Sequence, residues 1–291
     1  MKNPLVSIIV PTRNSSQTLE ACLASIHNQT YKPIELIVVD RDSTDDTKKI
    51  AKKYTKHVYN HGPERCAQRN FGAVKATGKY LVMIDSDMEL DPKVIQACVD
   101  TIESDKKIKE VVIPEESFGQ GFWAQCKRLE RSFYVGVSWI EAARFFTKEA
   151  YDKANGYDET MVSGEDWDLS RRIEEQARPS GATAGQGSAI ANIDEFIRHN
   201  EGRIKLWKTL RKKYYYAQHA KAYLTQNKDG SNLTAQKGPI QRYKLFLSHP
   251  KKLLKNPFLG TSMLLMKTCE FGAGGLGYFH TKNLSTKENL S

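Results

Sequence analysis

Two aspartates at positions 85 and 87 follow an apolar run from Tyr80 to Ile84. The run predicts a buried strand, so both carboxylates stand where that strand ends. Mg²⁺ and Mn²⁺ prefer oxygen ligands, and substrate phosphates commonly complete their coordination. An isolated Asp-x-Asp often arises by chance, but one that follows an apolar strand favours a site for a metal ion and a diphosphate. We therefore expect Asp85 and Asp87 to share Mn²⁺ or Mg²⁺.

Two other predicted strands end in polar residues in the same way. Short β-branched runs at 6–10 and 34–39 predict buried strands, and helical spacing follows each of them. Strands that alternate with helices are typical of a mostly parallel sheet with helices on both faces, which binds ligands at the carboxyl ends of its strands. The polar residues that these two strands would deliver to that edge are Thr12, Arg13, Asn14, Asp40 and Asp42. Three strand ends meeting at one edge indicate an active site.

The same periodicities predict the other elements of this domain. Further strands are expected at 57–59, 111–113 and 142–147, with a return toward the sheet at 190–197. Helices are expected at 19–27, from Ser43 or Thr44 to Tyr54, at 65–76, after Pro92 and at 168–175, with loops at 155–168 and 178–188.

Several motifs, in this order along the chain, resemble those of family 2 glycosyltransferases with the GT-A fold. They are the segments 4–14, 34–40 with 43–47, 69–72, 76–87, 155–158 and 164–168, and together they span roughly residues 4–200. The resemblance implies an α/β fold of the GT-A type and the transfer of a sugar from a nucleotide donor.

The resemblance also implies roles for the matching residues on the donor side. Pro11, Thr12, Asn14 and Asp40 would line the nucleoside pocket, and Arg69 with its neighbour Asn70 would lie near the nucleotide or the diphosphate. Asp85 would contact the ribose or the sugar, Asp87 would bind the metal ion, and His199 stands where some GT-A enzymes place a further metal or phosphate ligand.

On the acceptor side, the segment Gly164 to Asp168 contains an adjacent Glu165 and Asp166. The resemblance implies that Asp166 is the general base of an inverting displacement and that Glu165 supports the acceptor or donor pocket. An inverting transfer needs a carboxylate within hydrogen-bond reach of the acceptor hydroxyl. The alternative is a purely structural helix N-terminus, where acidic residues are favoured by the helix dipole.

Two departures from the family pattern bear on the substrates. Family members commonly carry two adjacent acids after the second strand, whereas this chain has Arg41 between Asp40 and Asp42, which leaves UDP and GDP open as the nucleotide. The Gln-x-x-Arg-Trp motif of processive synthases is absent, and the corresponding region runs from Arg203 to Arg211. Transfer of a single sugar is therefore favoured over polymerisation.

Composition adds an expectation about partners and location. The formal charge of the 291-residue chain is +10, and residues 201–255 hold fourteen Lys or Arg against two acids. Such a basic segment indicates an anionic partner, either a membrane surface, a phosphorylated lipid or nucleic acid. Five dispersed cysteines and no secretory signal at the N-terminus fit a reducing compartment. We expect a cytoplasmic protein at the inner face of the cell membrane.

The C-terminal part is expected to form a helical extension, residues 226–291, after a glycosyltransferase domain at 1–225. A basic helix is predicted at 203–223, a polar linker at 228–239, and an apolar segment at 257–278 that Lys267 and Glu270 interrupt. Central charges make it costly for this segment to span a bilayer, which favours an interfacial helix or a re-entrant hairpin. A helix docked on the domain or in a dimer contact is the alternative.

The leading interpretation is a membrane-surface glycosyltransferase that acts on a polyprenyl-linked or other envelope glycan. A sugar-phosphate nucleotidyltransferase is less favoured, because such enzymes open with a Gly-rich loop and residues 11–16 contain no glycine. A non-enzymatic lipid- or nucleic-acid-binding protein would use the basic segment with Tyr214, Tyr215 and Tyr216, and a catalytically inactive transferase fold belongs to the same class. Nucleic acid is the less favoured of these partners.

Overall fold

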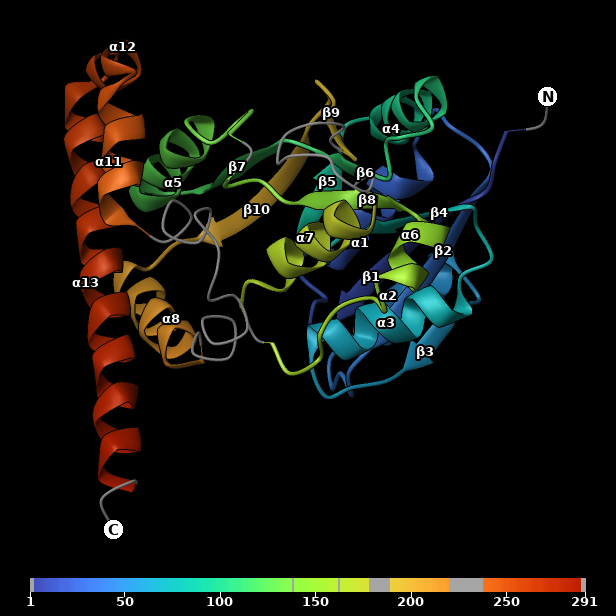
Figure 1. The fold of residues 1–291 in the computed structure, drawn as a ribbon, viewed down its shortest axis with the longest axis horizontal. Coiled ribbons are helices and arrows are strands. Elements are labelled where there is room, and N and C mark those ends of the chain that lie inside the picture. The colour runs from blue at the N-terminus through green and yellow to red at the C-terminus, as the bar shows by residue number, and fades with distance from the viewer. Residues whose placement is uncertain (1–2, 138, 162, 178–188, 220–237, 289–291) are drawn as a thin grey trace. The chain divides into compact units, whose positions relative to one another are not determined.

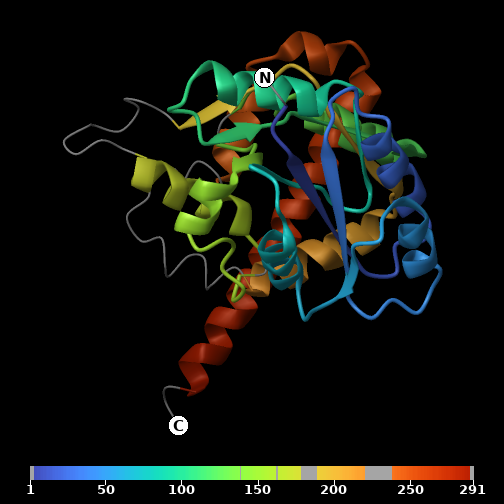
Figure 2. The same cartoon turned by 90° about the vertical axis from the view of Figure 1, so that its right-hand side faces the viewer.

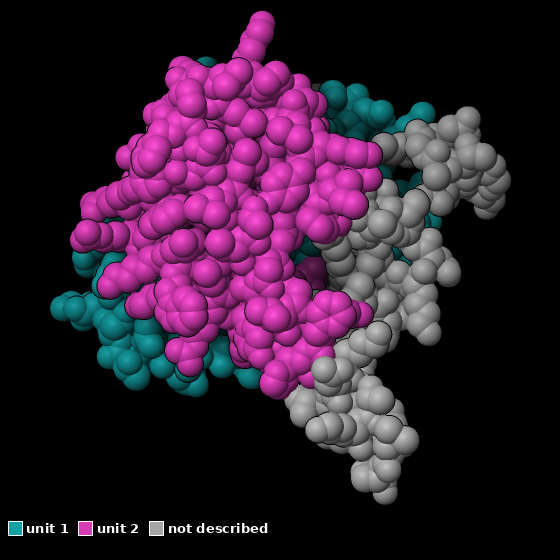
Figure 3. Space-filling view, turned by 90° about the vertical axis from the view of Figure 1, so that its left-hand side faces the viewer, with its two compact units in different colours: residues 1–116, 141–159, 165–200 teal, residues 117–140, 160–164, 201–291 magenta. Residues whose placement is uncertain are grey.

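The structure is a computed structural model that describes residues 3–137, 139–161, 163–177, 189–219 and 238–288. The chain forms two compact units (Figure 3). Unit 1 comprises residues 1–116, 141–159 and 165–200, and unit 2 comprises residues 117–140, 160–164 and 201–291. The domain boundary predicted at residue 225 lies outside the described residues and stays a prediction.

Unit 1 is built on a seven-stranded sheet with the order β3-β2-β1-β4-β8-β6-β9 (Figure 1). Strands β1, β2, β3 and β4 pair in parallel, and β8 runs antiparallel to both β4 and β6. The predicted mostly parallel α/β sheet is therefore confirmed. The strands are β1 (Val6–Thr12), β2 (Ile34–Asp40), β3 (Val58–Asn60), β4 (Tyr80–Met83), β6 (Glu110–Val112), β8 (Ala143–Thr147) and β9 (Ile190–Asn192).

Helices cover both faces of this sheet, and Figure 2 shows strands with helices on either side. One core contains residues of α1 (Leu19–His27), α2 (Thr47–Tyr54) and α4 (Val94–Ser104). The other contains residues of α3 (Arg65–Lys75), α6 (Lys148–Lys153) and α7 (Glu165–Ala177). Successive side chains of a strand point to opposite faces, so Ile8 of β1 packs in the first core and Ile9 in the second.

A smaller sheet has the order β5-β10-β7, with β5 (Met88–Leu90), β10 (Ile197–Arg203) and β7 (Glu115–Gln120). The return predicted at 190–197 thus consists of two strands, β9 and β10. His199 pairs with Met88 in the antiparallel β10–β5 ladder, and the backbone N–H of Asn200 donates to the carbonyl oxygen of Asp87 at 2.8 Å. This ladder brings His199 beside the Asp-x-Asp motif.

Unit 2 is mainly helical. Its helices are α5 (Phe122–Ser132), α8 (Leu206–His219), α11 (Pro239–Leu247), α12 (Pro250–Leu254) and α13 (Pro257–Glu288). A core that includes Cys126, Phe133, Phe246, Met263 and Met266 joins α5, α11 and α13. Among the described residues, no helix combines the length and the apolar character needed to cross a membrane.

Helix α13 runs without a break through the apolar segment predicted at 257–278. The re-entrant hairpin was therefore a wrong expectation: the glycines of this segment are accommodated within one helix, and Gly277 packs against the backbone of Tyr214 in α8. Helix α13 also packs on α5, so it is docked within unit 2. The interfacial role of the helix stays a prediction.

Element boundaries differ from the expectation at two functional positions. Helix α7 begins at Glu165, three residues before the predicted start, so Glu165 and Asp166 lie in its first turn and not in a loop. The predicted basic helix is α8, which is described up to His219, and residues 220–223 lie outside the described part. The same holds for the predicted loop at 178–188 and for residues 228–237 of the predicted linker.

Candidate active site

Asp85 follows the end of β4 and faces two arginines. Its Oδ1 atom accepts a hydrogen bond from Nη2 of Arg69 at 2.8 Å, and its Oδ2 atom lies 3.7 Å from Nη1 of Arg144. Burial alone would raise the pKa of the Asp85 carboxyl, but the charges of Arg69, Arg144 and Arg65 outweigh it and hold this pKa well below its usual range. Asp85 is therefore a carboxylate whose two oxygens both face protein cations.

Arg69 joins the two acidic motifs of the chain. Its side chain is only 1% exposed, and its Nη1 atom lies 3.1 Å from Oδ1 of Asp166 while Nη2 holds Asp85. The Arg69 guanidinium also lies over the ring of Tyr157, 5.1 Å from its centroid. Burial opposes the charge of Arg69, but Asp85 and Asp166 keep its pKa above the ordinary value. One buried cation thus fixes the end of β4 against the first turn of α7.

A glycine lets α3 approach the sheet closely enough for Arg69 to reach both motifs. A Cβ atom at Gly72 would lie 2.5 Å from Cγ2 of Ile9 in β1, which is closer than side chains pack. Gly72 stands on the turn after Arg69, at the i+3 position of the same helix. The separation between α3 and β1 therefore depends on the absence of a side chain at residue 72.

The N-terminal turn of α7 carries the two acids of the second motif. Glu165 is 5% exposed and its Oε1 atom accepts a hydrogen bond from Nη2 of Arg65 at 2.9 Å, whereas Asp166 is 26% exposed. Burial and the adjacent charge of Asp166 raise the pKa of Glu165, and Arg65 and Arg69 oppose that shift only in part. The helix dipole favours negative charge at both positions. Of the two acids, Asp166 is the one more open to a substrate.

Asp87 and His199 form a second pair of possible ligands. Nε2 of His199 lies 3.3 Å from Oδ2 of Asp87, and these side chains are 21% and 42% exposed. Nδ1 of His199 lies 4.0 Å from Oε2 of Glu115 at the start of β7. Glu115 in turn accepts from Arg144, with the Nη2 and Oε1 atoms 2.7 Å apart. A chain of polar contacts therefore runs from Asp85 through Arg144, Glu115 and His199 to Asp87.

These residues fit a divalent cation only when its coordination is completed by a substrate. In the described part of the chain, no group of three or more His, Cys, Asp or Glu side chains is arranged to hold a metal ion. Mg²⁺ commonly takes one or two protein carboxylates together with substrate phosphates and waters, which matches a partial site made of Asp87 and His199. The cluster also combines five carboxylates with three guanidinium groups, an excess of two negative charges: Asp85, Asp87, Glu115, Glu165 and Asp166 against Arg65, Arg69 and Arg144.

The residues predicted to line the nucleoside pocket are gathered at the ends of β1 and β2. Thr12 pairs with Asp40 in the parallel ladder and donates a hydrogen bond to its Oδ1 atom at 3.0 Å. Asp40 is fully buried and also accepts from the backbone N–H of Ser43, and the side-chain oxygen of Asn14 accepts from the backbone N–H of Thr44 at 2.9 Å. Pro11 is buried within β1. These groups shape two adjacent loops, and their contact with a nucleoside stays a prediction.

The side chain of Asn70 makes hydrogen bonds with residues 151–159 of the chain. Its side-chain oxygen accepts from the backbone N–H of Tyr157 and from the hydroxyl of Tyr151, and its Nδ2 donates to the carbonyl oxygen of Tyr157 and to Glu159. The loop that it holds turns at Asn155 and Gly156, where φ is 61° and 63°. The observed role of Asn70 is to position this loop, which carries Tyr157 toward Arg69. Its predicted contact with the nucleotide stays a prediction.

Four residues of the site had no role in the sequence-based hypothesis, and one of them is Arg65, which holds Glu165. Gln68 is buried and donates from Nε2 to the carbonyl oxygens of Thr12 and Val39, so it ties α3 to the ends of β1 and β2. Arg144 and Glu115 link the first aspartate of the motif to His199. The one available signal was an arginine inside the apolar strand predicted at 142–147, because a charge in a central strand needs a partner.

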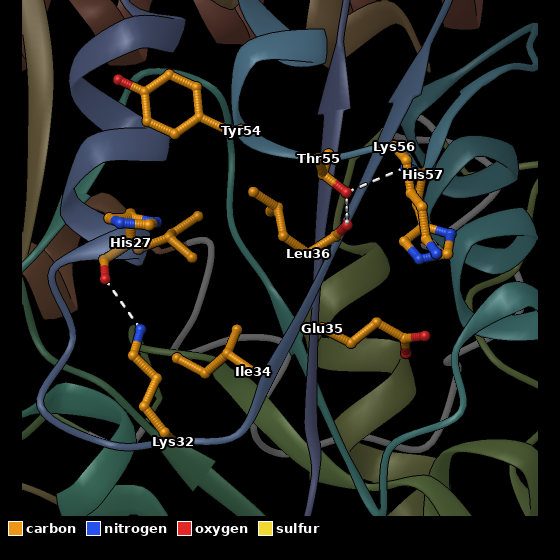
Figure 4. Close-up of a pocket in the computed structure, with 10 residues that line it drawn as sticks. His27, Lys32, Ile34, Glu35, Leu36, Tyr54, Thr55, Lys56 and His57 are labelled. Atoms are coloured by element: carbon orange, nitrogen blue, oxygen red, sulfur yellow. Dashed lines mark hydrogen bonds between the residues drawn. The ribbon is translucent and has the colours of Figure 1, made fainter.

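A separate pocket lies away from this cluster. It is lined by residues at the start of β2 and around β3, among them His27, Lys32, Glu35, Tyr54 and His57 (Figure 4). Several of its polar groups bond to one another, as when Lys32 donates to the carbonyl oxygen of His27 and Thr55 to that of Leu36. The pocket is at the opposite ends of the strands from Asp40 and Asp85, so we do not assign the active site to it.

A parallel α/β sheet that brings an Asp-x-Asp motif and a Glu-Asp motif to one buried arginine defines a glycosyltransferase of the GT-A type. The sequence model for glycosyl transferase family 2 matches residues 7–160, just over half of the chain. The chain belongs to this family.

Similar proteins agree with this assignment. Chondroitin synthase from Escherichia coli is 27% identical over 186 residues, which are 59% of this chain and 27% of that protein. GalNAc(5)-diNAcBac-PP-undecaprenol beta-1,3-glucosyltransferase from Campylobacter jejuni is 36% identical over 97 residues, which are 30% of this chain and 31% of that protein. The matched regions thus span less than a third of the length of these two relatives.

The fold also matches solved structures. Mannosyltransferase PcManGT from Pyrobaculum calidifontis, in complex with GDP-Man and Mn²⁺, superposes with a TM-score of 0.62 at 16% identity, covering 96% of this chain and 88% of that one. TarS 1-349 from S. aureus, in complex with UDP-GlcNAc, gives a TM-score of 0.51 at 14% identity, covering 96% and 91% of the two chains. At these identities the similarity shows the GT-A fold.

Proposed function

We propose that this glycosyltransferase transfers one sugar, with inversion, from a nucleoside-diphosphate sugar to an acceptor hydroxyl or phosphate in a reaction that needs Mn²⁺ or Mg²⁺. The observation that carries the proposal is the bridge made by Arg69, which is 1% exposed and holds both Asp85 and Asp166. A donor-side carboxylate and an acceptor-side carboxylate are thereby fixed relative to each other. Such fixed geometry is what a displacement between two substrates requires.

On the donor side, Asp87 and His199 would hold the cation, and the diphosphate oxygens would complete its coordination. When bound, the cation would neutralise charge that develops on the leaving nucleoside diphosphate. Asp85, as the other predicted metal ligand, has both oxygens beside arginines, so we assign it to orienting the sugar or the ribose. Arg69 and Arg144 keep Asp85 ionised. Because both carboxylate oxygens are then unprotonated, they can accept hydrogen bonds from sugar hydroxyls.

On the acceptor side, Asp166 would remove the proton from the attacking hydroxyl. It is the more exposed acid of the motif, and Arg69 holds one of its oxygens at 3.1 Å while the carboxylate remains 26% exposed. Glu165 is buried against Arg65, and we assign it to positioning the neighbouring side chains of the site. A positioned general base of this kind accelerates such a step by about 10²- to 10⁴-fold.

Relatives offer support for the proposed substrates. The C. jejuni relative is named for a PP-undecaprenol acceptor, and the two structural neighbours are complexes with GDP-Man and UDP-GlcNAc. We propose a polyprenyl-linked or other envelope glycan acceptor for this chain, and either UDP or GDP as the nucleotide of the donor. An acceptor of this kind would place the enzyme at the inner face of the cell membrane. Because the processive motif is absent, we propose that one sugar is added per reaction.

The reaction is tested by following the anomeric configuration of the product by NMR. A panel of UDP- and GDP-sugars is supplied with Mn²⁺ or Mg²⁺ and with a polyprenyl-diphosphate-linked acceptor. The proposal predicts transfer from one donor with an inverted anomeric centre and no transfer in excess chelator. A product that retains the donor configuration, or transfer that continues in chelator, would contradict the mechanism.

A further inference from the structure

Helix α13 turns apolar side chains toward solvent between Phe258 and Phe279. Phe258, Leu265, Leu276 and Phe279 are 71%, 58%, 68% and 62% exposed. Their spacings are close to whole numbers of helical turns, so they form one strip along the helix, which we call the apolar strip. Several exposed apolar side chains on one side of a helix mark an interaction surface more often than isolated apolar residues do.

The two charged residues of α13 between residues 257 and 280 point inward. Between residues 257 and 280 the only charged residues in the sequence are Lys267 and Glu270, and they are 7% and 3% exposed. Lys267 lies 2.7 Å from Oε1 of Glu130 and 2.9 Å from Oε2 of Glu270. Lys127 completes the cluster at 2.8 Å from Glu130 and 3.5 Å from Glu270. Lys267 and Lys127 therefore pair with Glu130 and Glu270 inside unit 2, and the outer side of α13 carries no formal charge between residues 257 and 280.

The helices that precede α13 add positive charge. Lys244 of α11, Lys251 of α12 and Lys255 between α12 and α13 are exposed, and we call them the basic flank. Ile240, Leu247 and Leu254 on the same two helices are 68%, 63% and 68% exposed. Glu270 is the only acid in the sequence from residue 239 to 280, and it is buried. The exposed charge of this part of unit 2, which faces the viewer in Figure 3, is therefore of one sign.

We propose that the apolar strip and the basic flank together dock unit 2 on the surface of an anionic lipid bilayer, with α13 lying along the membrane–water interface. Apolar side chains next to lysines are the combination that binds such an interface, because hydrophobic burial and attraction to anionic headgroups act together. A second copy is the less suitable occupant, since a two-fold contact through the same surface would bring the basic flanks of both copies together. The docking surface would bring the active site to a membrane-embedded acceptor, and only this part of the inference rests on the proposed function.

The test is co-sedimentation of the full chain with vesicles of phosphatidylcholine alone or mixed with phosphatidylglycerol. The parent should bind the mixed vesicles at least about tenfold more tightly than the neutral ones, since three lysines near an anionic surface each contribute. Leu265→Ser with Leu276→Ser should weaken binding by about tenfold or more, because two exposed side chains lose their burial in the interface. Lys251→Glu with Lys255→Glu should remove the preference for phosphatidylglycerol.

Matched controls lie in unit 1. Val74→Ser removes an apolar side chain that is 79% exposed on α3, and Lys49→Glu with Lys52→Glu reverses two exposed lysines on α2. Both controls should bind vesicles as the parent does. Sedimentation velocity without lipid should give the same oligomeric state for the parent and for the Leu265 and Leu276 variant.

The proposal is overturned if the parent does not bind the mixed vesicles. It is equally overturned if the leucine variant and the lysine variant bind them as the parent does. It is also overturned if the leucine variant converts a dimeric parent to a monomer, because the strip would then be a contact between copies. Donor binding is measured separately, without vesicles, on the parent and on Asp87→Ala. A parent that binds the donor but not the mixed vesicles would reject the docking surface alone. A parent that binds the mixed vesicles but no donor would reject the proposed function alone.

Discussion

At the scale of single residues, the geometry of the site depends on which carboxylates each buried arginine contacts. Arg69 is buried and contacts acids from two motifs that lie 81 positions apart in the chain, from Asp85 to Asp166. A guanidinium can serve both because its donors project in a fixed planar fork, whereas a lysine ammonium acts as a point charge. The arginine, and not either acid alone, therefore sets the distance between the donor and acceptor sides.

Replacing Arg69 tests this dependence. Arg69→Lys keeps the positive charge but loses the fork, so we expect donor affinity and turnover to fall by about tenfold or more while the fold survives. Arg69→Met removes the charge and leaves Asp85 and Asp166 without this partner, which should lower the free energy of unfolding by about 3 kcal/mol. Chemical denaturation and isothermal titration with the donor measure the two effects. A lysine variant with parental donor affinity would contradict the bridging role.

The two acids of α7 have separable roles. Asp166→Asn keeps the size of the side chain and removes the base, so turnover should fall by about 10²- to 10⁴-fold with little change in donor affinity. The matched variant Glu165→Gln should lose far less turnover, because Glu165 is buried against Arg65. Steady-state kinetics on both variants decides the matter. A larger loss in Glu165→Gln than in Asp166→Asn would reverse the assignment.

The residues of the two acidic motifs could be predicted from the sequence, because carboxylates at this spacing are typical of metal binding and of general base catalysis. Asp85, Asp87, Glu165 and Asp166 could be named from spacing and resemblance. The structure brings Asp85, Glu165 and Asp166 to the same buried arginine, and it places Asp87 beside His199. Glu115 was not foreseen, because a glutamate in an irregular stretch carries no local signal of its contact with Arg144, 29 positions away. The hydrogen bonds of Asn70 to its neighbouring loop were equally out of reach, since they depend on where residues 151–159 fold back.

At the scale of elements, the strands that hold the site contain a buried acid with no part in the proposed reaction. Glu110 in β6 is fully buried and accepts a hydrogen bond from Ser170 of α7 at 2.9 Å. Burial, together with the nearby charge of Glu174, raises its pKa to about 8 from an ordinary value of 4.5, although the bond from Ser170 opposes the shift. The carboxyl therefore stays protonated in the folded protein at pH values where the unfolded chain has released the proton.

This residue should make stability depend on pH. The stabilising contribution of the neutral carboxyl is fully present below pH 4.5 and is lost as the pH rises through about 8. Glu110→Gln should therefore raise Tm relative to the parent by an amount that grows between these two values. The control is Glu149→Gln, which makes the same substitution at an exposed acid of α6. Thermal melts across this range provide the measurement, and parallel curves for the parent and Glu110→Gln would contradict the argument.

Most elements of unit 1 could be predicted because each carries its own periodicity. Helix α1 begins and ends where its apolar spacing predicts, and β1 and β2 extend one or two residues past the predicted ends. Helix α7 begins earlier than predicted. Glu165 and Asp166 were assigned to a loop, but the helix dipole also favours acidic residues in a first helical turn. In unit 2, helix α5 was not predicted, because its buried Glu130 pairs with Lys267, a contact that the sequence does not reveal locally.

At the scale of the whole molecule, the chain combines a site-bearing unit with a helical unit that has a polar centre. Glu130 and Lys267 lie 137 positions apart and meet at 2.7 Å in the interior of unit 2. Burial would raise the pKa of Glu130, but Lys127 and Lys267 hold it well below the ordinary value. From the sequence, Lys267 and Glu270 interrupted an apolar segment, and only the packing of α13 on α5 shows why a helix carries them inside.

Removing one member of this cluster should be more damaging than neutralising a matched pair. Lys267→Met leaves Glu130 and Glu270 with one lysine between them, which should lower the free energy of unfolding by about 3–5 kcal/mol. Lys267→Met combined with Glu130→Gln should recover part of that loss, because the cluster again balances. Denaturant titration of the parent, of Lys267→Met, of Glu130→Gln and of the double variant gives the coupling. Additive losses in the double variant would show that the two residues do not act as a pair.

The most direct test of the central claim is metal-dependent donor binding, measured by thermal shift across UDP- and GDP-sugars with Mn²⁺ or Mg²⁺. The parent should be stabilised by one donor only when a divalent cation is present. Asp87→Ala should lose that response, while Asp100→Ala, which changes an exposed aspartate of α4, should retain it. A parent that responds to no donor with either metal, or an Asp87→Ala variant that responds as the parent does, would contradict the account.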